Sequence, residues 1–228
     1  MNVIILAGGK GERLKPLTIN VPKPMVMVKE KPILWYILKQ LKYYGINKVN
    51  LTVGYKASVI TKYFKKNFLD LEISFFNDGN VDIIERIRAV VKKKPKEDAL
   101  ILYGDTISDV KIDELLDFSK KNKQHSILTV WPLQTNFGVV EINNKKEITA
   151  FKEKPRLDKF INIGYFVLRK ELFGYLDDYN NYGDFLTFCG NNKFLKAYVH
   201  DGEHFTVNNV VDLKLAEKNI NKIKIFKK

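Results

Sequence analysis

The sequence is poor in the residues on which several kinds of chemistry and targeting depend. Cys189 is its single cysteine, so a disulfide within the chain is excluded. It has no run of eighteen apolar residues, which argues against a transmembrane helix. Its first residues lack a basic segment, and the apolar run there is too short for a signal peptide. We therefore expect a cytoplasmic protein that makes no use of a membrane.

Acidic residues are also in short supply relative to basic ones. The chain carries 39 Lys and Arg against 26 Asp and Glu, for a formal net charge of +13. The lysines are scattered, and no helix-turn-helix, zinc-finger or RNP pattern accompanies them, so we do not expect nucleic acid as a partner. A positive field of this kind suits an anionic phosphate substrate.

Alternating strand and helix patterns fill the first part of the chain, and 228 residues suit one domain. Four strand–helix units predict a parallel sheet with helices on both faces. The expected strands are 3–7, 48–53, 71–76, 99–103 and 126–131, and the expected helices are 32–44, 57–67, 81–93 and 112–121. The pattern then changes to a hairpin (138–142 with 147–151), a strand (161–168) and helices near 171–176 and 212–221.

This order of elements predicts the fold class. We expect an α/β, three-layer, Rossmann-like domain with a mainly parallel mixed sheet. The change of pattern after Trp131 suggests a nucleotide-binding half at about 1–131 and an acceptor-binding half at about 132–228 of the same domain.

The first motif that carries chemistry is a glycine-rich loop after the first strand. It reads Leu-Ala-Gly-Gly-Lys-Gly-Glu-Arg-Leu over residues 6–14. Three glycines in four positions let the backbone approach a ligand closely, and successive N–H groups can cradle phosphate oxygens. Arg13 could add a bidentate contact to an anion. The spacing fits neither a Walker A loop nor the dinucleotide fingerprint, and a tight turn beside a surface arginine is the alternative.

The second motif is Val-Pro-Lys-Pro-Met at residues 21–25. Two prolines restrict the backbone on both sides of Lys23, which suits a lysine that must stay against an anion. Taken alone, the motif is explained as well by a stiff loop with an exposed lysine.

Together, the two motifs resemble the sugar-1-phosphate nucleotidyltransferase family, and the resemblance extends over most of the chain. Further segments similar to this family are 31–35, 53–56, 103–106, 137–140, 151–155, 161–165 and 207–213. The resemblance implies an enzyme that joins a nucleoside triphosphate (NTP) to a small phosphorylated acceptor, a sugar 1-phosphate or a non-sugar molecule, with release of pyrophosphate.

The resemblance also implies a role for individual residues. Arg13, Lys23 and Asp105 would be catalytic, and Asp105 and Asn208 would hold Mg²⁺ as the cofactor. The nucleotide would bind at Leu6, Ala7, Gly8, Gly9, Gly11, Arg13, Lys23, Gly79 and Gly104. The acceptor would bind at Gly138, Glu153, Lys154, Asn162 and Gly164.

Such chemistry needs no nucleophilic side chain, because the acceptor phosphate is already an anion that can attack the α-phosphorus. Positioning and charge neutralisation suffice. His125, His200 and His204 lie outside every motif and are expected to be structural, as is Cys189. Segments 31–35, 85–87 and 103–105 look somewhat like the glucose-1-phosphate cytidylyltransferase branch, which favours CTP over GTP, dTTP or UTP. The short chain would also suit heptose or mannose guanylyltransferases.

Two departures from the family pattern leave alternatives open. Residues 77–87 replace a glycine- and alanine-rich segment with bulky side chains, and Asn208 stands where many relatives have a metal-binding aspartate. Asparagine is a neutral oxygen ligand, weaker than a carboxylate for Mg²⁺. A catalytically impaired, nucleotide-binding regulatory subunit is therefore the competing hypothesis. The sequence also lacks the β-helix tail of some relatives, and it leaves a homo-oligomer open.

Overall fold

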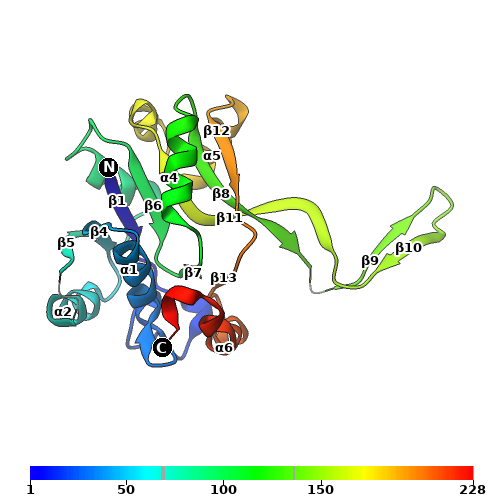
Figure 1. The fold of residues 1–228 in the computed structure, drawn as a ribbon, viewed down its shortest axis with the longest axis horizontal. Helices are drawn as coiled ribbons and strands as arrows, with labels where there is room; N and C mark the ends of the chain where they lie inside the picture. The colour runs from blue at the N-terminus through cyan, green and yellow to red at the C-terminus, as the bar shows by residue number, and fades with distance from the viewer. Residues whose placement is uncertain (68–69, 136, 228) are drawn as a thin grey trace.

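A seven-stranded sheet forms the centre of the molecule in the computed structural model, which describes residues 1–67, 70–135 and 137–227 (Figure 1). The strand order is β12-β8-β11-β6-β1-β4-β5. The strands are β1 (Asn2–Leu6), β4 (Lys48–Val53), β5 (Glu72–Asn77), β6 (Ala99–Tyr103), β8 (Ser126–Gln134), β11 (Arg156–Leu168) and β12 (Leu195–Val199).

Four neighbouring strands of this sheet, β6, β1, β4 and β5, are parallel, as predicted. β1 pairs in parallel with β4 on one side and with β6 on the other, and β4 pairs in parallel with β5. β11 runs antiparallel to both of its neighbours, β6 and β8, so the whole sheet is mixed. The expected class, a three-layer α/β fold with a mainly parallel mixed sheet, is confirmed.

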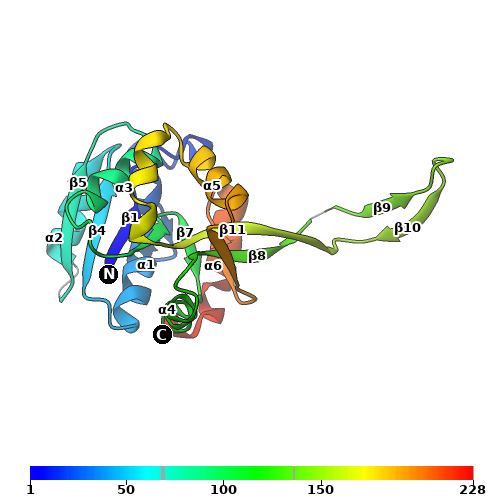
Figure 2. The ribbon, with the colours of Figure 1, turned by 90° about the horizontal axis from the view of Figure 1, so that it is seen from above.

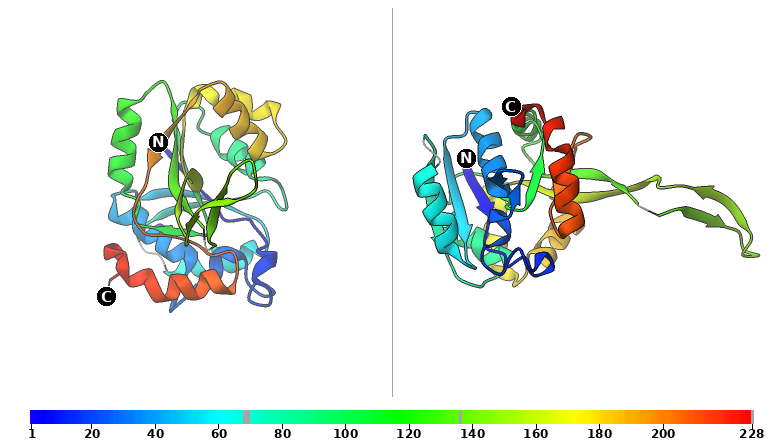
Figure 3. Two further views of the ribbon diagram at one scale, coloured as in Figure 1. Left: turned by 90° about the vertical axis from the view of Figure 1, so that its right-hand side faces the viewer. Right: turned by 90° about the horizontal axis from the view of Figure 1, so that it is seen from below.

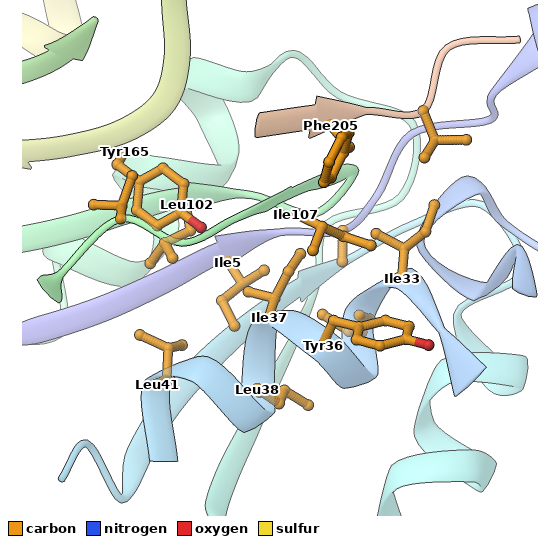
Figure 4. Close-up of a cluster of buried hydrophobic side chains, with 14 of the residues drawn as sticks. Ile5, Ile33, Tyr36, Ile37, Leu38, Leu41, Leu102, Ile107, Tyr165 and Phe205 are labelled. Carbon is orange, nitrogen blue, oxygen red and sulfur yellow. The ribbon is translucent and has the colours of Figure 1, made fainter. Parts of the chain in front are cut away.

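Helices cover both faces of the sheet (Figure 2). They are α1 (Ile33–Tyr43), α2 (Ala57–Asn67), α3 (Ile83–Val91), α4 (Ile112–Lys121), α5 (Tyr182–Asn191) and α6 (Val210–Asn219). Successive strand residues point to opposite faces, so Ile5 joins one hydrophobic core and Ile4 the other. Figure 4 shows the first of these cores, where Ile37 and Leu41 of α1 lie beneath Ile5 and Tyr165 of the sheet.

The second half of the chain differs from the predicted elements in several places. A helix expected at 171–176 is instead two 3₁₀ helices, Lys170–Leu172 and Gly174–Asp178. Helix α5 and strand β12 were not predicted. The two glycines of α5, Gly183 and Gly190, weaken its helical signal. Short strand pairs complete the fold: β2 (Met27–Val28) with β3 (Lys31–Pro32), and β7 (Thr106–Ser108) with β13 (His204–Thr206).

The predicted hairpin is present, and it projects from the body as an arm (Figures 1 and 2). Its strands are β9 (Val139–Ile142) and β10 (Ile148–Lys152), which form a sheet of their own. β8 and β11 are longer than predicted, and their outer parts lead from the central sheet to this arm. Within the described residues, no helix combines the length and apolar character needed to cross a bilayer.

Candidate active site

A cavity of about 360 Å³ opens where the parallel strands β1 and β6 end. Ligands of open α/β sheets bind at this edge, beyond the carboxyl ends of the strands. The cavity is lined by Leu6, Gly8, Gly9, Lys23, Pro24, Asn80, Val81, Asp82, Ile83, Arg86, Tyr103, Gly104 and Asp105. Residues of both sequence motifs, 6–14 and 21–25, therefore line one site.

Gly8, Gly9 and Gly11 of the first loop have different structural roles. A Cβ added at Gly8 would lie 2.2 Å from the guanidinium of Arg86. Gly11 has a φ of 69° in the left-handed region, and a Cβ there would lie 2.7 Å from Cβ of Lys23. A Cβ on Gly9 would meet no atom within 4 Å. Gly8 and Gly11 are thus required by the fold itself, whereas Gly9 leaves open space that a ligand could fill.

Lys23 reaches the cavity because its neighbours fix the loop that carries it. Pro22 precedes a 3₁₀ helix, Lys23–Met25, in which Pro24 and Met25 are buried. The amide N–H of Met25 donates to the carbonyl of Pro22 at 2.8 Å. With Met25 anchored in the core, Lys23 and Pro24 are held at the wall of the cavity.

Charged and polar groups from four distant segments converge at the cavity mouth. Lys23 Nζ lies 2.5 Å from Oδ2 of Asp105 and donates to Oδ1 of Asn208 at 2.9 Å. Arg13 Nη2 donates to the same oxygen of Asn208 at 3.2 Å. The structure therefore brings together all three residues expected to be catalytic and the second expected metal ligand.

The oxygens of Asp105 and Asn208 fit a hard divalent cation. Both already surround one cationic atom, Lys23 Nζ, and Mg²⁺ prefers oxygen ligands of this kind. Mg²⁺ commonly takes only one or two protein ligands, with substrate phosphates and water supplying the others. Across residues 1–67, 70–135 and 137–227, no group of three or more His, Cys, Asp or Glu side chains is arranged to hold a metal ion.

Arg86 lines the cavity, although no role was predicted for it. It is only 4% exposed, and its guanidinium donates to the carbonyls of Val53 and Gly79, each at 2.7 Å. Burial lowers the pKa of this arginine, while the nearby carboxylates of Asp78 and Asp82 oppose the shift. Two sequence signals bore on it: its place in a segment of bulky side chains, and the resemblance of residues 85–87 to the cytidylyltransferase branch. Gly79, with a φ of 72°, serves to turn its carbonyl toward Arg86.

Tyr103 forms part of the cavity wall and links it to two of the predicted acceptor residues. Asn162 Nδ2 donates to the hydroxyl of Tyr103 at 3.1 Å. Gly164 has a φ of 79°, and a Cβ there would lie 2.4 Å from the ring of Tyr103. Burial raises the pKa of Tyr103, so the hydroxyl stays protonated at neutral pH. Asn162 and Gly164 thus lie directly behind the cavity.

The other predicted acceptor residues lie at the base of the arm. The side chains of Glu153 and Lys154 are exposed and form an ion pair with a 3.7 Å separation. Gly138 lies against Phe151, whose ring a Cβ at position 138 would approach to 2.5 Å. None of the three is among the described residues that line the cavity. Their role in acceptor binding, and the division of the chain into two halves, stay predictions.

Comparisons with known proteins identify the family of this chain. The sequence model of the family described as "Nucleotidyl transferase" matches residues 2–209. Glucose-1-phosphate cytidylyltransferase of Salmonella typhimurium is 32% identical over 203 residues, 78% of this chain and 79% of the relative. D-glycero-alpha-D-manno-heptose 1-phosphate guanylyltransferase of Campylobacter jejuni is 32% identical over 231 residues, 92% of this chain and all of the relative.

A solved structure supports the fold in the same way. UTP-bound UGPase from Acinetobacter baumannii superimposes with a TM-score of 0.77 over 96% of this chain and 93% of its own, at 14% identity. The chain therefore belongs to the nucleotidyl transferase family. Within that family it is an enzyme of the sugar-1-phosphate nucleotidyltransferase class.

Proposed function

We propose that this enzyme transfers a nucleotidyl group from CTP to a sugar 1-phosphate, with Mg²⁺ as cofactor and pyrophosphate as the second product. The observation that carries the proposal is the convergence of Arg13, Lys23, Asp105 and Asn208 at the mouth of a glycine-lined cavity. Such a site offers positive charge and oxygen ligands, which phosphoryl chemistry requires, and it needs no nucleophilic side chain.

Each of these residues has a proposed role in binding the triphosphate or in neutralising its charge. The triphosphate lies along the Gly8–Gly11 loop, with Arg13 and Lys23 neutralising its oxygens. Asp105 and Asn208 would hold Mg²⁺, which would further neutralise the phosphates. An oxygen of the acceptor phosphate attacks the α-phosphorus in line, and the bond to the leaving pyrophosphate breaks. The main contribution of the protein is to hold the two anions close together against their mutual repulsion.

Arg86 supports the choice of base. Its guanidinium presents five N–H donors, of which two are used by the carbonyls of Val53 and Gly79. A base that offers two adjacent acceptors, such as N3 and O2 of cytosine or O6 and N7 of guanine, suits such a donor. Uracil and thymine offer a donor at N3. The side chain also fills the space between Gly8 and Gly54, which favours the smaller cytosine over guanine.

The acceptor is proposed to lie beside Tyr103, with Asn162 and Gly164 fixing that ring. Family resemblance adds Glu153 for acceptor hydroxyls and Lys154 for the acceptor phosphate. A phosphorylated acceptor other than a sugar would satisfy the same charges, so the acceptor has to be tested by a panel.

Asn208 favours one competing function, a nucleotide-binding regulatory subunit with impaired catalysis. A neutral amide contributes less than a carboxylate to holding Mg²⁺. The intact Arg13, Lys23 and Asp105 argue for the enzyme.

Pyrophosphate release, measured with CTP, GTP, dTTP, UTP and ATP against a panel of sugar 1-phosphates and other phosphorylated small molecules, tests the proposal. We expect turnover that depends on Mg²⁺ and is fastest with CTP and a sugar 1-phosphate. Preference for another triphosphate would contradict the assignment of cytosine. Absence of turnover in every combination, with nucleotide still bound, would establish the regulatory alternative.

A further inference from the structure

Four polar side chains form a continuous line of hydrogen bonds that starts at Asp105 in the active site. Thr106 Oγ1 donates to Oδ1 of Asp105 at 3.3 Å and lies 3.0 Å from Oγ1 of Thr206. Thr206 Oγ1 in turn lies 2.9 Å from Nε2 of His204. Within the described part of the chain, the wall of the cavity includes Asp105 but none of the other three. The line therefore runs from the site into the structure behind it.

Strand pairing brings these side chains together. In the antiparallel pair of β7 and β13, Thr206 lies directly opposite Thr106, and His204 lies directly opposite Ser108. Directly opposed residues share a face, as do residues two apart on one strand, so the two threonines and His204 lie on one face. β13 then leads through Asn208 into α6, the orange-red helix in Figure 3. The strand pair is therefore next in the chain to both residues proposed to hold Mg²⁺.

The carboxylate of Asp105 fixes the direction of every hydrogen bond in this line. An ionised carboxylate only accepts hydrogen bonds, and a threonine hydroxyl carries a single proton. Thr106 donates its proton to Asp105, so it must accept the proton of Thr206. Thr206 then has no proton left for the imidazole, so Nε2 of His204 must be the donor. The ring proton of His204 therefore belongs on Nε2.

The surroundings of His204 keep its ring neutral and in place. Burial lowers the pKa of His204 to about 4, so at neutral pH the ring carries one proton. The ring of Trp131 packs on it, with 5.6 Å between the ring centres. Trp131 is itself fixed, because its Nε1 donates to the carbonyl of Gly202 at 3.0 Å. His204 can thus serve as a fixed hydrogen-bond donor.

We propose that His204 is a positioning residue for the metal site. Acting through the two threonines, it holds the Asp105 carboxylate in the orientation that binds Mg²⁺. The last torsion of an aspartate side chain is soft, so a fixed donor to Oδ1 determines where Oδ2 points. Oδ2 lies 2.5 Å from Nζ of Lys23, which lines the cavity. Hydrogen bonds in such a line also polarise and strengthen one another. The effect on metal binding rests on the Mg²⁺ site proposed above, whereas the direction of the hydrogen bonds does not.

Replacement of Asp105 by asparagine should reverse the line. Lys23 Nζ would still require an acceptor, so the new amide oxygen would face Lys23 and the amide NH₂ would face Thr106. Thr106 would then donate to Thr206, and Thr206 would donate to Nε2 of His204. The ring proton of His204 should therefore move from Nε2 to Nδ1. A histidine that serves only to pack would not respond in this way to a change at the metal site.

The tautomer of His204 can be measured by ¹⁵N NMR of the full chain, because protonated and bare imidazole nitrogens differ in chemical shift. The chain has three histidines, and His204→Gln identifies the signals of His204 by their loss. At neutral pH, without metal or nucleotide, we expect the proton on Nε2 in the wild type and mainly on Nδ1 in Asp105→Asn. In a Thr206→Val background the line is interrupted, so Asp105→Asn should leave the His204 signals unchanged.

Two controls accompany this measurement. Thr129→Val removes a buried threonine hydroxyl that has no hydrogen-bond partner among the described residues, and it should preserve the response of His204 to Asp105→Asn. His200 contacts Ser108 and Asp109 instead of the line, so its tautomer should be the same in all variants.

Binding of Mn²⁺ alone, followed by the EPR signal of the free ion, tests the effect on the metal site. Mn²⁺ prefers the same oxygen ligands as Mg²⁺. Thr106→Val removes the donor to Asp105, whereas Thr106→Ser keeps it. Groups that orient a metal-binding carboxylate are typically worth 10–100-fold in affinity, so Thr106→Val should raise the Kd at least about tenfold and Thr106→Ser should not. His204→Leu should weaken binding by less, and His204→Gln, which keeps an N–H donor, should restore it.

A wild type with the ring proton of His204 on Nδ1 overturns the proposal, and this result does not depend on any variant folding. A His204 tautomer that ignores Asp105→Asn overturns it as well. Equal Mn²⁺ binding by the wild type and Thr106→Val, including no binding by either, shows that the line does not position the metal site. Since both measurements omit nucleotide and acceptor, their failure leaves the proposed reaction untouched, and an absence of turnover leaves both results untouched.

Discussion

Lys23 Nζ lies 2.5 Å from Oδ2 of Asp105, although the two residues are 82 positions apart in the chain. The pair is partly buried, with exposed fractions of 12% and 26% for the two side chains. In the ligand-free protein, each charge therefore satisfies the other. A triphosphate with its metal ion would offer Lys23 a phosphate and Asp105 a cation. The ion pair therefore holds the two side chains in position and can give way to the substrate.

Replacement of Lys23 by alanine should reduce turnover far more than nucleotide binding. Negative charge grows on the α-phosphate oxygens toward the transition state, and a single preorganised charge is typically worth roughly 10²–10³ in rate. Steady-state kinetics should show the loss mainly in kcat. A variant that keeps more than about a third of the wild-type kcat would exclude this lysine from the chemistry.

Replacement of Asp105 by asparagine should abolish Mg²⁺-dependent activity while the fold persists. Asp105 follows β6 at the edge of the sheet where ligands bind, and its Oδ2 contacts Lys23. Thermal unfolding without nucleotide should give a melting temperature close to that of the wild type. A large drop in melting temperature with normal activity would make Asp105 structural instead.

Asn208→Asp should tighten the Mg²⁺ requirement. An added negative charge beside a divalent cation is favourable, and more so where water is partly excluded. The variant should reach its half-maximal rate at a lower Mg²⁺ concentration than the wild type does. An unchanged Mg²⁺ dependence would mean that residue 208 does not contact the metal, and that its amide serves only to orient Arg13 and Lys23.

Gly8→Ala and Gly9→Ala form a matched pair. The methyl group at position 8 would overlap the guanidinium of Arg86, whereas the methyl group at position 9 meets open space. Gly8→Ala should displace Arg86, lower the melting temperature and weaken CTP binding, as measured by calorimetric titration. Gly9→Ala should leave the melting temperature unchanged. Equal melting temperatures for the two variants would show that Arg86 is not held against the loop.

His204 should make the protein less stable in mild acid. Burial, with a smaller contribution from His200, lowers the pKa of His204 to about 4 from a usual 6.5. Between these two values the unfolded chain binds a proton that the folded chain does not. The stabilising effect of neutral His204 is therefore complete above pH 6.5 and is lost progressively as the pH falls to 4.

Urea unfolding at pH 7.5 and pH 4.5 measures this effect. The free energy of unfolding of the wild type should fall by roughly 2 kcal/mol more than that of His204→Gln, which cannot titrate. Titration of the carboxylates changes the free energy of unfolding of the wild type and of His204→Gln equally, so the difference between the two proteins isolates His204. Equal losses in the two proteins would show that His204 is not kept neutral by the fold.

The first half of the fold could be predicted from the sequence because its elements have strong local signals. β1 reads as a continuous apolar run and is buried on both faces, and α1 begins directly after Pro32 and ends at Tyr43. The second half depends on long-range packing. Helix α5 buries Tyr182, Phe185 and Cys189 against distant elements, but its two glycines, Gly183 and Gly190, weaken the local helical signal.

The same distinction holds for the site. Arg13 and Lys23 could be predicted because each belongs to a recognisable loop motif. In the structure both side chains donate to Asn208. Arg86 could not be assigned, because an arginine on an amphipathic helix usually faces solvent. Only the fold shows that this one passes beneath the glycine loop to reach the carbonyls of Val53 and Gly79.

The position of Arg86 has a consequence for how nucleotide preference could change in evolution or by design. Its two hydrogen bonds join the end of β4 to the loop after β5, so the side chain is a structural tie as well as part of the cavity. A mutation that enlarges the cavity at this position leaves the buried carbonyl of Val53 without this donor, at about 1–3 kcal/mol, and also removes the partly buried bond to Gly79. A shift to a larger base by this route would therefore require a second, stabilising mutation first.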